Sequence, residues 1–415
     1  MGARVSDHLD GARLWRDLMD LARHGATPAG GVNRLALTPE EIDARRTLVD
    51  WVGEFGGSAA VDPAANLYLA LEGREPSRPP LLLGSHIDTQ PTGGKFDGAY
   101  GVVAGVAALR AIAASGRRPR RRIEVVAWMN EEGSRFAPGM MGSAVFTGKR
   151  TLDEVMAVKD KAGTSVKEAI APVLAKEATL AKRPMGFPVA GYVEAHIEQG
   201  PALEAKGKTI GVVTGIGGKR TFRVEVQGAP AHAGTSTRAE RRDALVSAVA
   251  IVDALQQAIW DKADTVRFTI GQFTVSPNAP SVVPGRVVFS VDLRHDDDET
   301  VRRLGDLVPV VCEKARGKCD VTVVPLLYDP PLQFPDAMRA RVAQAADALG
   351  YSHMELPSPA GHDSRYLHYH CPTGMVFIPC KEGLSHHEAE SITEADAAAG
   401  ARVLADVAWA LADEA

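Results

Sequence analysis

Four stretches of the 415-residue chain place histidines and carboxylates close together, and the first is GSHIDTQPTGGKFDG, residues 84–98. His86 and Asp88 are two residues apart at the end of an apolar strand, so both side chains point the same way; Asp97 follows a turn-forming glycine pair. Imidazole and carboxylate groups at a strand end indicate a metal site. Alternatively, His86 is a buried structural histidine and Asp97 a turn or helix cap, and these residues alone leave both interpretations open.

The second stretch, NEEGSRF, places Glu131 and Glu132 directly after the apolar run from Ile123 to Met129. Adjacent acids at the end of a buried strand are costly unless a cation or hydrogen bonds compensate them. One glutamate could ligate a metal while its neighbour acts as a base. A solvated loop with a helix cap is the alternative interpretation.

The third stretch, GYVEAHIEQGP, contains His196 between two glutamates, and the fourth, GLSHHEAE, places His386 ahead of the last helix. Imidazole and carboxylate groups from scattered strand ends are the ligands expected for zinc or another divalent first-row metal. Together with the first two stretches they could hold two ions about 3.5 to 4 Å apart and activate a water between them.

The elements around these stretches predict a parallel sheet. A strand at 81–83, an Ala- and Val-rich helix at 102–114 and a strand at 123–129 form a βαβ rhythm, typical of a sheet with buried strands. After Pro330-Pro331, a helix at 336–349, a strand at 375–378 and a final helix resume this domain. We therefore expect an α/β fold with a mixed, mainly parallel sheet and helices on both faces, formed discontinuously by residues 1–218 and 329–415.

Residues 219–328 show a different order. Strand patterns near 222–226, 266–275, 287–293 and 321–327 alternate with helical stripes at 245–259 and 301–311. The order β-α-β-β-α-β predicts an inserted ferredoxin-like α+β domain. Pro309 should kink or shorten the second helix.

Composition excludes several classes of protein. The 47 basic and 52 acidic residues give a net charge of −5, with no basic surplus for nucleic acid. The four cysteines form no CxxC pair and are too few to staple the chain, which favours a reducing, cytoplasmic setting. No secretory signal is evident and no run reaches 18 apolar residues, so we expect no membrane insertion.

The four stretches, together with PAHAG (230–234), PNAPSVVPG (277–285), DLRH (292–295) and AGHDS (360–364), resemble the dinuclear-metal hydantoinase/carbamoylase family. That family includes N-carbamoyl-L-amino-acid hydrolases, β-ureidopropionases and allantoate amidohydrolases, within the aminoacylase-like zinc exopeptidases. The resemblance runs in order from about residue 80 to residue 390.

The resemblance implies two divalent metal ions per subunit, zinc first, with manganese, cobalt or nickel as alternatives. It implies that one ion is held by His86, Asp97 and His196, and that Asp97 bridges to a second ion held by Glu132 and His386. Asp88 would orient His86, and Glu131 would be the general base.

For the inserted domain the resemblance implies a lid and a homodimer contact. Arg294 and Asn278 would clamp a substrate carboxylate, Gln199 and the Gly361 backbone would add polar contacts, and His232 would reach the partner subunit's site to stabilise an oxyanion. From the residues alone, Arg294 could instead pair with Asp292 on a solvated surface, and His232 could be an ordinary loop histidine.

The expected reaction is hydrolysis of the ureido C–N bond of N-carbamoyl-L-amino acids, or of N-carbamoyl-β-alanine, to amino acid, ammonia and carbon dioxide through a metal-bridging water. Allantoate amidohydrolase is the alternative, and a non-catalytic binding protein of the same fold is disfavoured because Glu131 and Asp97 are present. Ser281 and Cys380 stand where the family often has Asn and Ser or Thr, which weakens the substrate assignment most.

Overall fold

The structure, a computed structural model, describes residues 4–414, and these divide into two compact units. Unit 1 contains the described residues up to Thr214, Phe334–Leu356 and the residues from His362 onward; unit 2 contains Gly215–Gln333 and Pro357–Gly361. Among the described residues, no helix is long and apolar enough to cross a membrane.

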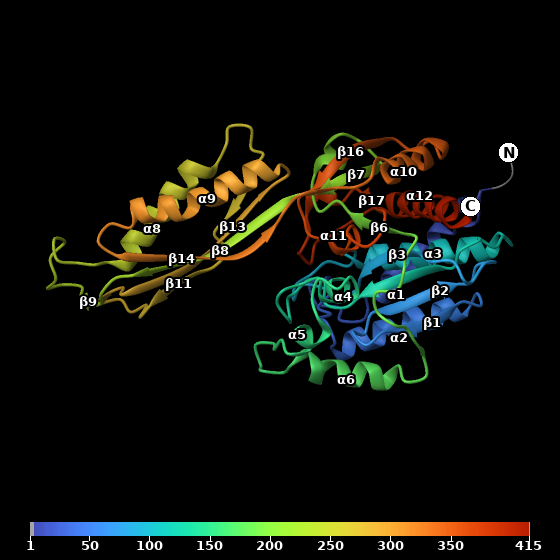
Figure 1. The fold of residues 1–415 in the computed structure, drawn as a ribbon, viewed down its shortest axis with the longest axis horizontal. Helices are drawn as coiled ribbons and strands as arrows, with labels where there is room; N and C mark the ends of the chain where they lie inside the picture. The colour runs from blue at the N-terminus through green and yellow to red at the C-terminus, as the bar shows by residue number, and fades with distance from the viewer. Residues whose placement is uncertain (1–3, 415) are drawn as a thin grey trace. The chain divides into compact units, whose positions relative to one another are not determined.

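A ten-stranded sheet is formed mainly by unit 1 (Figure 1). Its order is β15-β7-β17-β6-β3-β4-β2-β1-β5, β16 also pairs with β7, and the edge strand β15 comes from the residues of unit 2. The bounds are β1 Ser58–Val61, β2 Leu67–Leu71, β3 Leu81–His86, β4 Ile123–Trp128, β5 Ala181–Lys182, β6 Gly191–Ile197, β7 Ile210–Ile216, β15 Leu332–Gln333, β16 His353–Ser358 and β17 Thr373–Ile378. The central strands β4, β3, β6 and β17 are parallel, whereas β2 and β7 join antiparallel. The predicted mixed, mainly parallel sheet is confirmed.

The central strands are apolar on both faces because helices cover both. Leu81 and Leu83 of β3 face one hydrophobic cluster, while Leu82 faces another that contains Trp128 and Phe146. Such strands read in the sequence as continuous apolar runs rather than as alternating patterns.

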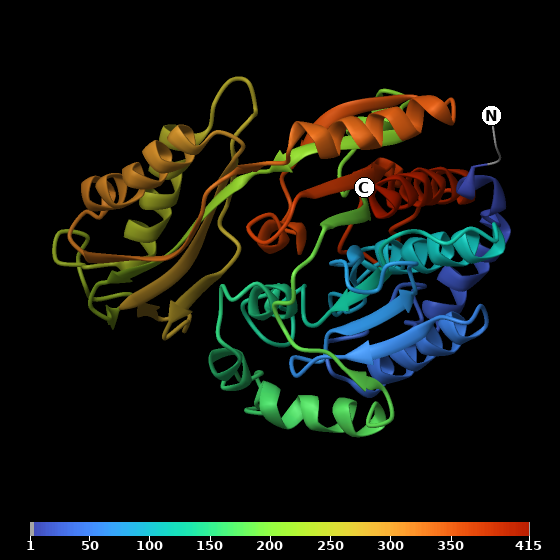
Figure 2. The same cartoon turned by 45° about the vertical axis from the view of Figure 1, so that its right-hand side comes forward.

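The larger cluster is formed with five helices: α1 Gly11–Leu21, α2 Pro39–Gly53, α3 Ala99–Ala114, α10 Asp336–Ala348 and α12 Glu394–Asp413. In the turned view of Figure 2, the red α12 runs alongside the teal α3. Helices α4 Met141–Phe146 and α11 Ser364–Leu367 cover the opposite face. The other helices of this unit are η1 Val5–His8, α5 Leu152–Met156, α6 Val166–Lys176, α7 Ala202–Ala205 and η2 Lys381–Gly383.

Helix α3 approaches the sheet closely at Gly101. A Cβ atom built there would lie 2.2 Å from the carbonyl oxygen of Ala195 on β6 and 2.8 Å from the Cβ of Ser85 on β3. Only glycine allows this approach, and it holds the first turn of α3 against the two strands that carry His86 and His196.

Unit 2 is an antiparallel sheet covered on one face by α8 Ala244–Ile259 and α9 Asp298–Ala315 (Figure 1). Its order is β10-β13-β8-β14, with β11 also on β13. The bounds are β8 Gly218–Gln227, β10 Arg267–Thr269, β11 Phe273–Ser276, β13 Arg286–His295 and β14 Asp320–Asp329; a ribbon pairs β9 Ala231–His232 with β12 Val282–Val283. Apolar side chains alternate along β8 and β13 and pack under the helices, as the period-2 pattern predicts.

One local expectation for unit 2 is wrong, and of the two effects expected of Pro309, a kink or a shorter helix, the second is absent. The single strand expected over 266–275 is divided into β10 and β11 by a bulge, because residues 270–272 face only residues 290–291 of β13. Within it, Gln272 N donates to Ser290 Oγ at 3.0 Å and Ser290 N donates to the Gln272 carbonyl at 3.1 Å. Pro309 does not shorten α9, which continues to Ala315. A proline inside a helix costs roughly 3 kcal/mol, and the buried face of α9, with Leu304, Val308 and Cys312, offsets that cost.

We predict that Gly101→Ala lowers the free energy of unfolding by about 2 kcal/mol or more, because the new methyl group meets the rigid backbone of β6. Urea unfolding followed by circular dichroism measures this. Gly53→Ala is the matched control, since nothing lies within 4 Å of the added Cβ near the end of α2. Equal midpoints for the two variants would contradict the packing argument.

Candidate metal centre

The histidines and carboxylates predicted to bind metal come from the ends of three neighbouring strands and from two loops. His86 ends β3, the two glutamates follow β4, and His196 lies near the end of β6. Asp97 directly precedes α3, and His386 lies in the loop between η2 and α12. Because β3, β4 and β6 are parallel, their carboxyl ends meet at one edge of the sheet, where ligands of α/β proteins commonly bind.

Asp97 lies at the centre of this group, only 4% exposed. Its Oδ1 is 3.2 Å from His196 Nε2 and 3.7 Å from His86 Nε2, and its Oδ2 is 3.2 Å from His386 Nε2. His386 Nε2 also lies 3.5 Å from Glu132 Oε2. Two groups of three potential ligands, His86–Asp97–His196 and Asp97–Glu132–His386, therefore share one carboxylate.

Backbone hydrogen bonds orient two of the imidazoles. His86 Nδ1 donates to the carbonyl oxygen of Asp88, and His196 Nδ1 donates to that of Ile197, each at 2.9 Å. Since a carbonyl can only accept, Nδ1 is the donor in both bonds. These bonds fix the rings so that the Nε2 atoms face Asp97. Gly98 makes room for the first ring, because it has a φ of 63° and a Cβ there would lie 2.3 Å from the His86 imidazole.

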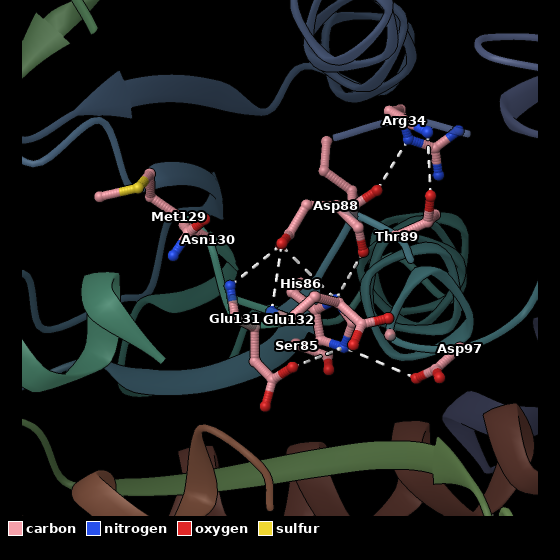
Figure 3. Close-up of polar contacts among 12 residues, drawn as sticks. Arg34, Ser85, His86, Asp88, Thr89, Asp97, Met129, Asn130, Glu131 and Glu132 are labelled. Carbon is pink, nitrogen blue, oxygen red and sulfur yellow. Dashed lines mark hydrogen bonds and ion pairs between the residues drawn. The ribbon is translucent and has the colours of Figure 1, made fainter. Parts of the chain in front are cut away.

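The Asp88 carboxylate has a different contact from the one expected. Its Oδ1 lies 3.7 Å from His86 Nδ1, beyond hydrogen-bond length, while its two oxygens accept the backbone N–H groups of Glu131 at 3.1 Å and of Glu132 at 3.2 Å (Figure 3). Asp88 thus orients His86 through its main-chain carbonyl and holds the two glutamates through its side chain.

Charge crowding perturbs the acids of the centre. Burial raises the pKa of Glu131 well above its usual range, and the nearby carboxylates of Asp363, Glu132 and Asp88 raise it further. Burial also raises the pKa of Glu132 to about 7. For Asp97, burial acts in the same direction, but hydrogen bonds from His196 and His386 outweigh it and hold its pKa well below normal.

Further polar side chains surround these groups. Gln199 Nε2 donates to Asp97 Oδ2 at 2.9 Å, while its buried Oε1 accepts no hydrogen bond from residues 4–414. Gln90 Nε2 donates to Glu132 Oε2 at 2.7 Å. Ser385 Oγ lies 3.1 Å from Asp97 Oδ2 and 3.0 Å from Glu390 Oε2. Sequence reasoning missed Gln90, Ser385 and Glu390, whose only signal was their place inside the stretches that carry the histidines.

In unit 2, Arg294 is already paired. Its Nε and Nη2 donate to the two oxygens of Asp292 at 2.9 and 3.2 Å, and its Nη1 donates to the carbonyl of Pro359 at 3.1 Å. Lys219 Nζ lies 3.1 Å from the same aspartate. The segment that ends at Gly361 therefore lies beside this arginine, whose remaining N–H groups are available to another acceptor.

His232 and Asn278 lie at the other end of β13. His232 pairs with Val282, and Ser276, just before Asn278, is in register with Arg286. Eight residues of extended strand, about 26 Å, separate Arg286 from Arg294, so one chain does not bring Asn278 and Arg294 together. His232 Nδ1 accepts the backbone N–H groups of Gly234 at 3.0 Å and Thr235 at 3.2 Å, which leaves its exposed Nε2 as a proton donor.

Comparison with known proteins agrees with this arrangement. Residues 82–410 match peptidase family M20/M25/M40. The chain is 40% identical to an N-carbamoyl-L-amino-acid amidohydrolase of Rhizobium meliloti, with 94% of each chain covered, and 32% identical to the allantoate amidohydrolase of Bacillus subtilis, with 94% of this chain and 95% of that one covered.

A crystal structure of a hydantoinase/carbamoylase family amidase from Burkholderia vietnamiensis superposes with a TM-score of 0.90, at 41% identity and with 98% of each chain covered. The strand order around the centre and the similarity over the full length both agree with membership of one family. The chain belongs to the M20/M25/M40 peptidase family, within its hydantoinase/carbamoylase amidase subfamily.

Proposed function

We propose that this amidohydrolase uses two divalent metal ions to cleave the ureido C–N bond of N-carbamoyl-L-amino acids, or of N-carbamoyl-β-alanine, to amino acid, ammonia and carbon dioxide. The observation that carries the proposal is the shared carboxylate of Asp97, whose two oxygens face different imidazoles. A carboxylate in this position fits a bridge between two cations.

The donor set fits divalent first-row metals, of which zinc is our first choice. His86, His196 and Asp97 would hold one ion, and Glu132 and His386 would join Asp97 at the second. All these donors are nitrogen or oxygen atoms. Burial, together with the neighbouring carboxylates, raises the pKa values of Glu131 and Glu132, and a bound cation would lower them. When bound, the two ions would supply Lewis-acid chemistry and lower the pKa of water.

Glu131 is the proposed general base. Its Oε2 lies 3.5 Å from His86 Nε2, so the carboxylate lies at the centre, and Asp88 holds its backbone. In this role Glu131 takes a proton from the attacking water and delivers it to the leaving nitrogen. Burial and the neighbouring carboxylates perturb the pKa of Glu131 strongly, which is typical of acids at functional sites.

Two groups support a ureido acid as the substrate. The unpartnered Oε1 of Gln199 is a buried acceptor beside Asp97, and a ureido N–H would satisfy it. Arg294 retains free N–H groups although Asp292 occupies one side of its guanidinium, and a carboxylate is the matching acceptor. We assign the Gly361 backbone a supporting polar contact beside this arginine.

We further propose a homodimer through unit 2, which would also act as a lid. Because Asn278 and His232 lie at the opposite end of β13 from Arg294, a site that uses all three needs two copies of the chain. The exposed Nε2–H of His232 would then stabilise the developing oxyanion in the partner subunit.

We predict that Gly98→Ala prevents full metal uptake, because the added methyl group would overlap the His86 imidazole. Gly116→Ala is the matched control: its φ of 67° gives similar backbone strain, but nothing lies within 4 Å of the added atom. Metal analysis after dialysis against zinc measures the outcome. Equal metal content in the two variants would contradict the role of His86 as a ligand.

Glu131→Gln should retain the metal content of the wild type and lose about 10²–10⁴-fold in kcat, the usual contribution of a general base. Ammonia release and metal analysis on the same preparation test both parts. Survival of kcat within tenfold would show that another group takes the proton.

Substrate identity is tested by ammonia release from N-carbamoyl-L- and D-amino acids, N-carbamoyl-β-alanine, allantoate and the neutral amide of the best substrate, each with zinc, manganese, cobalt or nickel. We expect an N-carbamoyl-L-amino acid to give the highest kcat/KM, and its neutral amide to lose at least tenfold because Arg294 has no carboxylate to bind. The highest kcat/KM with allantoate would favour the second candidate function, which the Bacillus subtilis relative supports.

A further inference from the structure

Glu390 lies four residues after His386, and it is buried, with 4% of its surface exposed. Its Oε1 accepts the backbone N–H groups of Phe96 at 2.9 Å and of Asp97 at 3.1 Å. Its Oε2 lies 3.0 Å from Ser385 Oγ. All these partners belong to the two loops that carry Asp97 and His386.

The contacts of Glu390 reach Asp97 by two routes. One is the direct bond from the Asp97 backbone, which fixes where the side chain begins. The other involves Ser385, whose single hydroxyl hydrogen can be donated either to Glu390 Oε2 or to Asp97 Oδ2, which lies 3.1 Å from its Oγ. Ser385 is also 3.3 Å from Gln199 Nε2, the second donor to that oxygen. The carboxylate of Asp97 is therefore held at both its backbone and its Oδ2 atom.

The glycine turn before Asp97 packs closely on the Glu390 side chain. A Cβ atom on Gly94 would lie 2.0 Å from Glu390 Oε1 and 2.5 Å from Glu390 Cβ, so the glycine turn that precedes Asp97 is closed directly over this side chain. Glu390 therefore joins the Gly94–Asp97 turn to the loop of His386.

We propose that Glu390 is a positioning residue that fixes Asp97 relative to His386 and thereby sets the affinity of the second metal position. The inference rests on the proposed function, because it concerns the ions that Asp97 would share. Without Glu390, two buried backbone N–H groups lose their acceptor and the His386 loop loses its tie to the Asp97 turn. The His86–His196 position depends on this tie less, since its imidazoles are oriented by the backbone carbonyls of Asp88, just after β3, and of Ile197, at the end of β6.

The test compares Glu390→Leu, which keeps the approximate volume but removes the acceptors, with Glu390→Gln, which keeps an acceptor oxygen for the two N–H groups. Glu382→Gln is the control, because it makes the same charge change on an exposed acid of η2, just before the His386 loop. Zinc binding to metal-free full-length protein is measured by competition with a chromophoric chelator, without substrate. Circular dichroism and thermal unfolding check that each variant is folded at the working temperature.

We expect Glu390→Leu to bind the weaker of its two zinc ions at least tenfold less tightly, the scale of outer-sphere changes at metal sites, and the tighter ion within threefold of wild type. Glu390→Gln and Glu382→Gln should both remain within threefold for each ion. A folded Glu390→Leu protein with wild-type affinities, or one that weakens both ions equally, would overturn the inference while leaving the proposed function intact. Wild-type protein that binds no zinc would overturn the proposed function as well, so the two failures are distinguishable.

Discussion

The arrangement of the histidines in the candidate metal centre depends on the buried carboxylate of Asp97. It is placed by a glycine turn and by the start of α3, and α3 is held against β3 and β6 because Gly101 has no side chain. His86 and His196 then approach Asp97 Oδ1 from two parallel strands, and His386 approaches Oδ2 from the far end of the chain. If any of these elements shifted by about 1 Å, the two groups of ligands would separate. Displacements of this size can lower a catalytic rate about 10²-fold.

Charge sets the second constraint. Four carboxylates, Asp88, Asp97, Glu131 and Glu132, lie around the edge of the sheet, and burial with mutual repulsion raises the pKa of the two glutamates. Burial also raises the pKa of Asp88, although its carboxylate accepts two backbone N–H groups. Asp97 differs, because it receives hydrogen bonds from imidazoles and from Gln199 and its pKa is held low. In unit 2, Arg294 is the proposed carboxylate-binding group. Hydrogen bonds to Asp292 and to the Pro359 carbonyl fix the direction of its guanidinium but do not use all of its N–H groups.

Much of the fold and of the centre could be predicted from the sequence because the signals are local. The apolar runs at β3 and β4 mark buried parallel strands, and polar residues directly after them must lie at one edge. Contacts made across the chain could not be predicted: no spacing rule connects Glu390 to Phe96, and none shows that the Asp88 carboxylate holds Glu131 while its carbonyl orients His86. Nor does the sequence reveal that β13 separates Asn278 from Arg294, because that requires the strand register.

The central claim is that Asp97 bridges two metal ions. Crystals grown with zinc and measured on both sides of the zinc absorption edge test it most directly, since anomalous difference density locates the ions without reference to activity. The account predicts two peaks about 3.5 to 4 Å apart on either side of the Asp97 carboxylate, one beside His86 and His196 and the other beside Glu132 and His386. A single peak, or a pair of peaks that does not flank Asp97, would contradict it.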